Sequence, residues 1–220
     1  MPRIALIHAL AHSLAPISDE LQREWPEAVR MNLLDDSLSA DLARAGRLDD
    51  AMTQRFIRLA DYAVGCGADA ILYTCSAFGP CIEAVQRRHA RIPVLKPNEA
   101  MVDEAAAVAR RRHAGGAIGL LATFGPTLAS MPPEFPADVT VCTALADGAM
   151  AALDRGDTAT HDAEAVKAAQ ALAAQGCVVI ALAQFSLARA AGPVAEACGL
   201  PVLTTPGSAV RRLKERLGAR

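Results

Sequence analysis

An internal repeat is the feature that most constrains how this chain can fold. Residues 67–78, GADAILYTCSAF, and residues 176–187, GCVVIALAQFSL, each begin at a glycine and continue as an apolar run. A polar tip follows eight residues beyond each glycine, and it is Cys75 in the first copy and Gln184 in the second. Each copy then passes through a helical stretch to a Pro-Val-Leu strand. The repeat predicts two similar halves that differ at this tip.

A second pair of segments supports the same division. Residues 3–17 and residues 116–131 each have an apolar strand followed by a polar loop. A glycine pair at 115–116 follows an Arg-rich stretch, and such a pair is typical of a helix end. We therefore predict two domains, residues 1–115 and residues 116–220. The last helical stretch of the chain can pack on either of them.

Short runs rich in Ile, Val and Leu alternate with longer Ala-rich stretches of helical periodicity. Continuous apolar runs of this length are typical of strands that are buried on both faces. The expected strands are residues 4–10, 29–33, 69–74, 93–95, 117–122, 139–143, 177–183 and 201–204. The expected helices are residues 41–66, 81–90, 99–113, 161–175, 187–198 and 208–217.

Alternating strands and helices predict parallel sheets that are covered by helices on both faces. We therefore expect an α/β fold of two pseudo-symmetric parallel-sheet domains, each with about four strands. Duplicated halves usually face each other across a shared cleft, so we expect the active site in the cleft between them. In open parallel sheets the ligand lies beyond the carboxyl ends of the strands. Residues that directly follow the strands are therefore the candidate site residues.

The charge and hydropathy of the chain exclude two classes of partner. The net charge is −2, and basic residues are scattered apart from helical clusters at 110–112 and 211–216, so we expect no nucleic-acid partner. No apolar stretch reaches the roughly 18 residues that span a bilayer, so we expect no membrane partner. The N-terminus enters a strand without a charged leader, which favours a cytoplasmic location.

The cysteines do not form a structural framework. All six are dispersed through apolar segments without a CxxC pair, so neither a disulfide framework nor a zinc site is expected. Cys75 differs from the others because it directly follows a strand, and Pro80 suits the first turn of the helix after it. A thiol beside the amides of a helix N-terminus has a lowered pKa. Cys75 is therefore a candidate acid, base or nucleophile.

Other polar residues of the first half have weaker signals. His8 and His12 are four residues apart, but they cross a strand end and a loop, so no metal site is expected and His8 is interpreted as a pocket-lining hydrogen-bond donor. Asp35-Asp36 could form an acid-base pair, but helix capping through Asp36 or Ser37 is the preferred interpretation. Asn98 is expected to cap the next helix, and it could also face the cleft.

In the second half, the polar tips follow two apolar strands. The segment GLLATFGPT contains Thr123 and Thr127, whose hydroxyls and backbone amides could hold a carboxylate where the strand feeds a helix. Threonine and glycine at a strand end are also common turn formers, so this signal is weak. Gln184 and Ser186 follow the other strand. We count all four as candidate substrate-site residues.

These segments resemble the aspartate/glutamate racemase superfamily. The resemblance depends on the strand-end Thr-Cys-Ser at 74–76 and on LLATFGPT at 120–127 within a duplicated α/β chain. Glutamate, aspartate and hydantoin racemases, maleate isomerase and arylmalonate decarboxylase belong to this superfamily. The resemblance implies a cofactor-independent enzyme that acts on a small carboxylate or hydantoin-like substrate. Dimers are frequent in the family, so a homodimer is among the expected states.

The resemblance also implies roles for individual residues. The racemases use two cysteines, one from each half, on opposite faces of the substrate carbon. Cys75 matches the first of them, Ser76 matches a neighbouring substrate-binding position, and Thr123 matches the loop that holds the substrate carboxylate. The second cysteine should stand near Gln184, where this chain has an amide that neither gives nor takes a proton near pH 7.

Three functions therefore stay open. One is a racemase or isomerase in which another group, such as His8 or Asp36, serves as the second base. Another is a single-cysteine decarboxylase or lyase, for which arylmalonate decarboxylase is a precedent, although its one cysteine belongs to the second half. A third is a protein that binds small carboxylates without converting them.

Overall fold

The computed structural model describes residues 1–112 and 116–219. The chain divides into two compact units: Met1–Asn98 with Ala209–Arg220 form the first, and Glu99–Ser208 form the second. Within the described residues, none of the helices is long and apolar enough to cross a membrane.

The first unit is built on a four-stranded parallel sheet with the order β2-β1-β3-β4. Its strands are β1 (Arg3–His8), β2 (Val29–Leu34), β3 (Ala70–Tyr73) and β4 (Val94–Leu95). The central strands β1 and β3 are buried along almost their whole length, as expected for strands with helices on both faces. The edge strand β2 alternates between exposed and half-buried residues at its carboxyl end.

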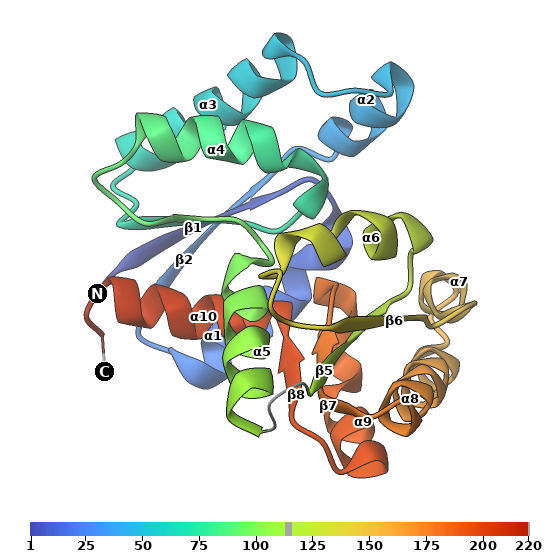
Figure 1. The fold of residues 1–220 in the computed structure, drawn as a ribbon. Coiled ribbons are helices and arrows are strands. Elements are labelled where there is room, and N and C mark those ends of the chain that lie inside the picture. The colour runs from blue at the N-terminus through green and yellow to red at the C-terminus, as the bar shows by residue number, and fades with distance from the viewer. Residues whose placement is uncertain (113–115, 220) are drawn as a thin grey trace. The chain divides into compact units, whose positions relative to one another are not determined.

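Helices cover both faces of this sheet. Figure 1 shows α3 and α4 on one side and α1 and α10 on the other. The helices are α1 (Leu14–Glu24), α2 (Ser37–Ala45), α3 (Asp50–Gly65), α4 (Gly79–Arg88) and α10 (Thr205–Arg216). Side chains of α2, α3 and α4 form one core with alternate residues of β1 and β3. Helix α10 contacts the end of α1, where Lys214 Nζ donates to the carbonyl of Glu24 at 3.3 Å.

The second unit has a sheet with the corresponding strand order, β6-β5-β7-β8, and all its strands are parallel. Its strands are β5 (Ala117–Ala122), β6 (Val141–Leu145), β7 (Cys177–Leu182) and β8 (Val202–Thr204). Its helices are α5 (Glu99–Arg112), α6 (Gly125–Ser130), α7 (Ala149–Asp154), α8 (Thr158–Ala174) and α9 (Ala191–Cys198). One face of the sheet packs against α7, α8 and α9, and the other packs against α5.

The strand order determines where polar tips come together. In each sheet, the first and third strands along the chain form the central pair. The second strand lies at the edge beside the first, and the fourth strand lies at the edge beside the third. The central pairs are β1 with β3 and β5 with β7. Ligands of open parallel sheets bind at such a switch point, beyond the carboxyl ends of the two strands. Cys75 follows β3, while Thr123 and Gln184 follow β5 and β7.

The predicted fold class is confirmed, with two parallel sheets of four strands each and helices on both faces. The single helix expected over 41–66 is two helices, because Gly46 ends α2 in the left-handed region at φ 67° and Asp49 caps α3. Helices α1, α6 and α7 were not expected. Helices α6 and α7 are only six residues long, and α1 buries only Ile17 and Leu21, so each gives a short pattern of buried positions or none.

The division into units differs from the boundary expected after residue 115. Helix α5 belongs to the second unit, because Met101, Val102, Ala105 and Ala109 pack against β5 and β7. The last helix belongs to the first unit from Ala209 onward. The helix end expected at the glycine pair 115–116 falls partly on residues 113–115, which lie outside the described residues.

Candidate active site

Cys75 lies where strand β3 passes into the helical layer. The backbone amide of Thr74 donates to the carbonyl of Ile7 at 3.1 Å, which continues the pairing of β3 with β1 by one residue. Cys75 keeps an extended conformation, and a short 3-10 helix, η2 (Ser76–Phe78), follows it directly. Helix α4 then begins with Pro80 in its first turn, as expected. Ser76 is exposed at the start of η2.

The protonation of Cys75 differs from the sequence-based expectation. Burial raises the pKa of the thiol, and a hydrogen bond from the backbone amide of Ala77 opposes this shift without cancelling it. The expected lowering by a helix N-terminus fails because only this one amide bonds the sulfur, while apolar side chains surround it. Cys75 is therefore a neutral thiol at pH 7, which can donate a proton.

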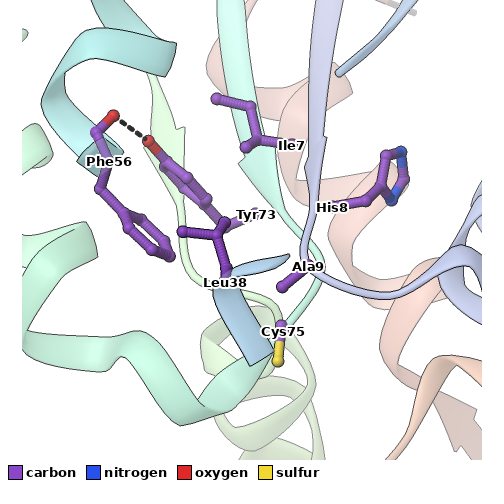
Figure 2. A pocket seen from close by; sticks show the side chains of 7 residues that line it. All are labelled: Ile7, His8, Ala9, Leu38, Phe56, Tyr73 and Cys75. Carbon is purple, nitrogen blue, oxygen red and sulfur yellow. Dashed lines mark hydrogen bonds between the residues drawn. The ribbon is translucent and has the colours of Figure 1, made fainter. Parts of the chain in front are cut away.

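A small pocket adjoins the thiol within the first unit. About 160 Å³ of space not filled by atoms lies there when open solvent is included, but almost none of it is wide enough for a water molecule. Strands β1 and β3 and helices α2 and α3 supply its walls, with Ile7, His8, Ala9, Leu38, Phe56, Tyr73 and Cys75 as the lining residues (Figure 2). The pocket is therefore mostly apolar, with a sulfur atom at one side.

His8 belongs to the pocket wall through its backbone, but its ring lies elsewhere. Figure 2 shows the imidazole on the opposite side of β1 from Ile7. The ring is fully buried, with Nδ1 at 2.9 Å from Thr74 Oγ1 and Nε2 at 3.0 Å from Asn32 Oδ1. Because Asn32 offers an acceptor, Nε2 carries the proton in the neutral ring. Burial lowers the pKa of His8, although the Asn32 bond opposes that effect.

Asp35 and Asp36 do not form an acid-base pair, because Asp35 instead joins an ion-pair network with Arg55 and Asp41. Arg55 of α3 donates to Asp35 Oδ2 at 2.7 Å and to Asp41 Oδ2 at 2.5 Å, and Ser37 Oγ donates to Asp35 at 2.5 Å. Burial alone would raise the pKa of Asp35, but the bonds from Ser37 and Arg55 outweigh it and lower the pKa. Asp36 occupies the N-cap position of α2 without a side-chain capping bond, so the expected capping bond is not formed.

Two polar residues of the second unit are bonded to each other. Gln184 Oε1 accepts from the backbone amide of Thr123 at 2.6 Å and from Thr123 Oγ1 at 2.9 Å. These residues follow the neighbouring strands β7 and β5, which also pair beyond Leu121 through the bond from Ala183 N to its carbonyl at 2.9 Å. The carboxamide oxygen is thus fully engaged, and the pair is a defined polar cluster at the carboxyl edge of the sheet.

Thr127, Ser186 and Asn98 are the remaining candidates. Thr127 is half-buried within α6, and Ser186 is half-buried in the 3-10 segment η4 (Phe185–Ala190) that follows Gln184. Asn98 is buried at the residue before α5, where a capping residue would stand, and its capping role stays a prediction. Among the described residues, there is no group of three or more His, Cys, Asp or Glu side chains that could hold a metal ion.

Sequence reasoning missed the pocket and the partners of His8. Leu38 and Phe56 are ordinary core residues by sequence, and only the fold brings them to the strand ends beside Cys75. Asn32 gave no signal, and Thr74 stood out only as part of the Thr-Cys-Ser motif. Their bonds to His8 join three different strands or strand ends, which the sequence does not reveal. The sequence signal that did exist was the position of His8 at the end of a buried run.

The comparisons with known proteins agree with this fold. A sequence model described as Asp/Glu/Hydantoin racemase matches residues 11–213. No protein among the curated ones matches the chain.

Several solved structures are similar in fold at low sequence identity. Glutamate racemase isoform RacE1 from Bacillus anthracis is 15% identical, with a TM-score of 0.70 over 99% of this chain and 82% of that one. Unliganded arylmalonate decarboxylase is also 15% identical, with a TM-score of 0.69 over 99% of this chain and 94% of that one. Allantoin racemase from Klebsiella pneumoniae is 16% identical, with a TM-score of 0.69 over 100% of this chain and 89% of that one.

Proposed function

The chain belongs to the Asp/Glu/hydantoin racemase family, and from this premise we propose that it is a cofactor-independent enzyme in which Cys75 transfers a proton at a substrate carbon next to a carboxylate or carbonyl. The substrate is a small carboxylate or a hydantoin-like molecule. The observation that carries the proposal is the position of Cys75 after a central strand of a parallel sheet, at the switch point where ligands of such sheets bind.

The state of the thiol favours the role of an acid. Burial raises the pKa of Cys75, so the S–H form is present at neutral pH and can protonate a carbanion or enediolate. The thiolate that results regains its proton from solvent. Removal of a substrate proton by Cys75 requires the thiolate, which burial disfavours in the resting protein.

The second unit supports a reaction with one proton-transferring group. A carboxamide does not titrate near neutral pH, and the oxygen of Gln184 is already bonded by Thr123. We therefore favour one-sided chemistry over inversion by two thiols. In a decarboxylation of this kind, the bond between the α-carbon and the departing carboxylate breaks, and carbon dioxide leaves. The electrons of that bond stay on the substrate as an enediolate, and the thiol of Cys75 then protonates the α-carbon.

The hydroxyl and amide groups of the candidate site have supporting roles in this proposal. By the family resemblance, Ser76 and the Thr123 loop hold the substrate carboxylate, and Gln184 fixes the conformation of Thr123. Thr127, Ser186 and Asn98 remain further candidates for substrate contacts. Donors of this type stabilise the charge that develops on the enediolate oxygens.

Proton transfer in D2O tests the proposal. Deuterium incorporation at the α-carbon is followed by NMR for each enantiomer of amino acids, for hydantoins, and for substituted malonates that lose carbon dioxide. We expect Cys75→Ala to lower the rate by about 10²- to 10⁴-fold, the range of general acid catalysis. Cys198→Ala is the matched control, since it removes a half-buried thiol from the second unit, and it should keep the wild-type rate.

The outcomes separate the open functions. Deuterium incorporation into a product of one configuration supports a single proton donor. Deuterium incorporation into both enantiomers, with inversion at the α-carbon, supports two unequal proton-transferring groups. Equal rates for wild type and Cys75→Ala, with both proteins folded by circular dichroism, would contradict the role of Cys75. Thermal stabilisation by small carboxylates without any turnover would favour a binding protein.

A further inference from the structure

A polar network of three side chains, His8, Asn32 and Thr74, lies directly before Cys75. Thr74 Oγ1 is 2.9 Å from His8 Nδ1, and His8 Nε2 is 3.0 Å from Asn32 Oδ1. Because Nε2 donates its proton to Asn32, Nδ1 is the acceptor and the hydroxyl of Thr74 donates to it. The imidazole is fully buried and Thr74 is 5% exposed, while Asn32 lies at the surface. The network therefore joins the end of β3, through β1, to β2.

The main chain adds a second attachment at the same place. The pairing of β3 with β1 ends at Tyr73, and the amide of Thr74 donates to the carbonyl of Ile7 at 3.1 Å. Thr74 is therefore held by its backbone and by its side chain, and Cys75 follows it in an extended conformation. Adjacent side chains of an extended segment point to opposite faces of a sheet. The bond from Thr74 thus fixes the backbone of Cys75 without occupying the sulfur, which accepts from the amide of Ala77.

The second unit shows that the strand ends do not require polar side chains at these positions. Ala183 and Ala122 occupy the positions of Thr74 and His8, because their backbones make the corresponding bonds between neighbouring strands. Two methyl groups suffice there, where the first unit buries a hydroxyl and an imidazole. Burying such polar groups costs free energy unless each of them is bonded. The network therefore points to a task that only the first unit performs.

The two units differ in the residue that follows this position. The first unit has Cys75 there, and the second has Gln184. Gln184 Oε1 accepts from the amide and the hydroxyl of Thr123, so the tip of the second unit is fixed through its own side chain. A reacting thiol is not fixed in that way, because its sulfur has to meet the substrate. In the first unit the fixed side chain is instead that of the preceding residue, Thr74.

We propose that His8 is a positioning residue for the reaction of Cys75, and that it acts through its bond to Thr74. The inference rests on the proposed function, because it assumes that the sulfur of Cys75 reacts. His8 takes no proton from the substrate, since both ring nitrogens are bonded and the ring lies on the opposite side of β1 from Ile7 (Figure 2). A displacement of about 1 Å at a reacting atom lowers a rate by up to about 10²-fold, so a fixed strand end favours fast proton transfer.

Alkylation of Cys75 by iodoacetamide tests the network without any enzymatic assay. The thiolate displaces iodide and forms a thioether, and peptide mass spectrometry measures the rate at Cys75. Thr74→Val keeps the shape of the side chain but removes the hydroxyl. We expect it to raise the rate by about threefold or more, because a thiol that leaves the core has a larger thiolate fraction. Thr74→Ser should react at close to the wild-type rate, because serine has the same donor.

Thr205→Val is the matched control for Thr74→Val. Thr205 is fully buried in the second unit and its Oγ1 donates to the carbonyl of Leu182 at 2.9 Å, so this variant also loses a buried hydroxyl bond. It should leave the rate at Cys75 close to that of the wild type, because Thr205 shares no bond with the network. An equal rise in both variants would reveal a general loss of stability and overturn the proposal. A rate in Thr74→Val no higher than in the wild type would overturn it as well.

A double-mutant cycle tests whether His8 acts through Thr74. His8→Leu removes both ring bonds, and we expect it to raise the alkylation rate at least as much as Thr74→Val does. If the two residues act through one bond, Thr74→Val adds nothing to His8→Leu, whereas independent effects multiply. Multiplied effects, or a wild-type rate in His8→Leu, would overturn the role of His8.

Asn32→Ala gives the same test at an exposed position, for the case that a buried variant does not fold by circular dichroism. It removes the acceptor of His8 Nε2 and leaves the core side chains in place. We expect it to raise the alkylation rate at Cys75, because the imidazole loses one of its two attachments. A wild-type rate in Asn32→Ala would contradict the role of His8.

Turnover distinguishes failure of this inference from failure of the proposed function. In the D2O assay, Thr74→Val should lower kcat by about tenfold or more with KM nearly unchanged, because the bond fixes the reacting residue and contacts no substrate. Thr74→Ser and Thr205→Val should both keep the wild-type kcat. Turnover that depends on Cys75, with a wild-type kcat in Thr74→Val, would refute the positioning role and leave the proposed function standing. Faster alkylation of Thr74→Val without turnover in any of the proteins would refute the proposed function, and the role of His8 with it.

Discussion

His8 is held as a neutral imidazole inside the first unit, and this has a consequence for stability. Burial lowers its pKa in the folded chain, with the Asn32 bond opposing that shift, whereas the unfolded chain titrates near the ordinary value of about 6.5. The unfolded state therefore binds the extra proton first as the pH falls. The contribution of His8 to stability is complete at pH values above its pKa in the unfolded chain. It is lost as the pH falls toward its pKa in the folded chain.

We expect the free energy of unfolding to decrease below about pH 6.5 through His8, by at most ~1.4 kcal/mol for each pH unit. Denaturant unfolding between pH 7.5 and 5 measures the slope for the wild type and for His8→Gln. The variant loses stability at every pH because the bonds to Thr74 and Asn32 change, but its slope should be shallower. Parallel curves for the two proteins would show that His8 does not carry this dependence.

At the scale of single elements, strand β5 must allow helix α8 to approach closely. A Cβ atom on Gly119 would lie 2.9 Å from Ile180 Cδ1 and 3.1 Å from Leu172 Cβ, so a side chain at this position requires the end of Ile180 to move and Leu172 to give way by a few tenths of an ångström. We expect Gly119→Ala to destabilise the protein by about 1–3 kcal/mol, the usual cost of overpacking a core. Chemical denaturation monitored by circular dichroism measures this loss.

Gly192 provides the matched control for this substitution. It lies in helix α9, and a Cβ there would meet no atom within 4 Å. Gly192→Ala should therefore be neutral or stabilise the protein by up to about 1 kcal/mol, because alanine is the better helix former. A loss of equal size in both variants would point to a general effect of replacing glycine instead of overpacking.

The elements differ in how far the sequence could predict them. Buried strands such as β5 are continuous apolar runs, and their nearly full burial makes the pattern easy to interpret. Helix α1 buries only Ile17 and Leu21, and its Pro16 lies in the first turn, so its periodic signal is short. The break between α2 and α3 depends on the left-handed conformation of Gly46, which a long Ala-rich stretch does not reveal.

The sequence predicted the candidate site only where the site depends on which elements directly precede and follow a residue. Cys75 is found by its place between a strand and a helix with Pro80, and the structure keeps that order. Its raised pKa was not predictable, because it results from burial of the thiol against a core that several elements build. Burial by distant segments of the chain decided the chemistry of the thiol more than the helix that follows it.

At the scale of the whole molecule, the two compact units are not the two halves of the chain. The second unit is one continuous segment, Glu99–Ser208, whereas the first combines Met1–Asn98 with the last helix. Helix α5 supplies the buried side chains Met101, Ala105 and Ala109 to the core around β5 and β7. A fragment that starts after this helix would expose that face of the sheet to solvent.

We expect a fragment of residues 99–208 to fold cooperatively, while a fragment of residues 116–220 does not. Deleting α5 removes apolar side chains that are each buried to 98% or more, and helices lost from one face of a sheet are rarely compensated. Urea unfolding followed by circular dichroism and by the exchange of backbone amides compares the two fragments. Both contain the repeat from Gly176 to Pro201, so a difference between them reports on α5 together with the segment after Ser208. Cooperative folding of residues 116–220 alone would support the division expected from the repeat in the sequence.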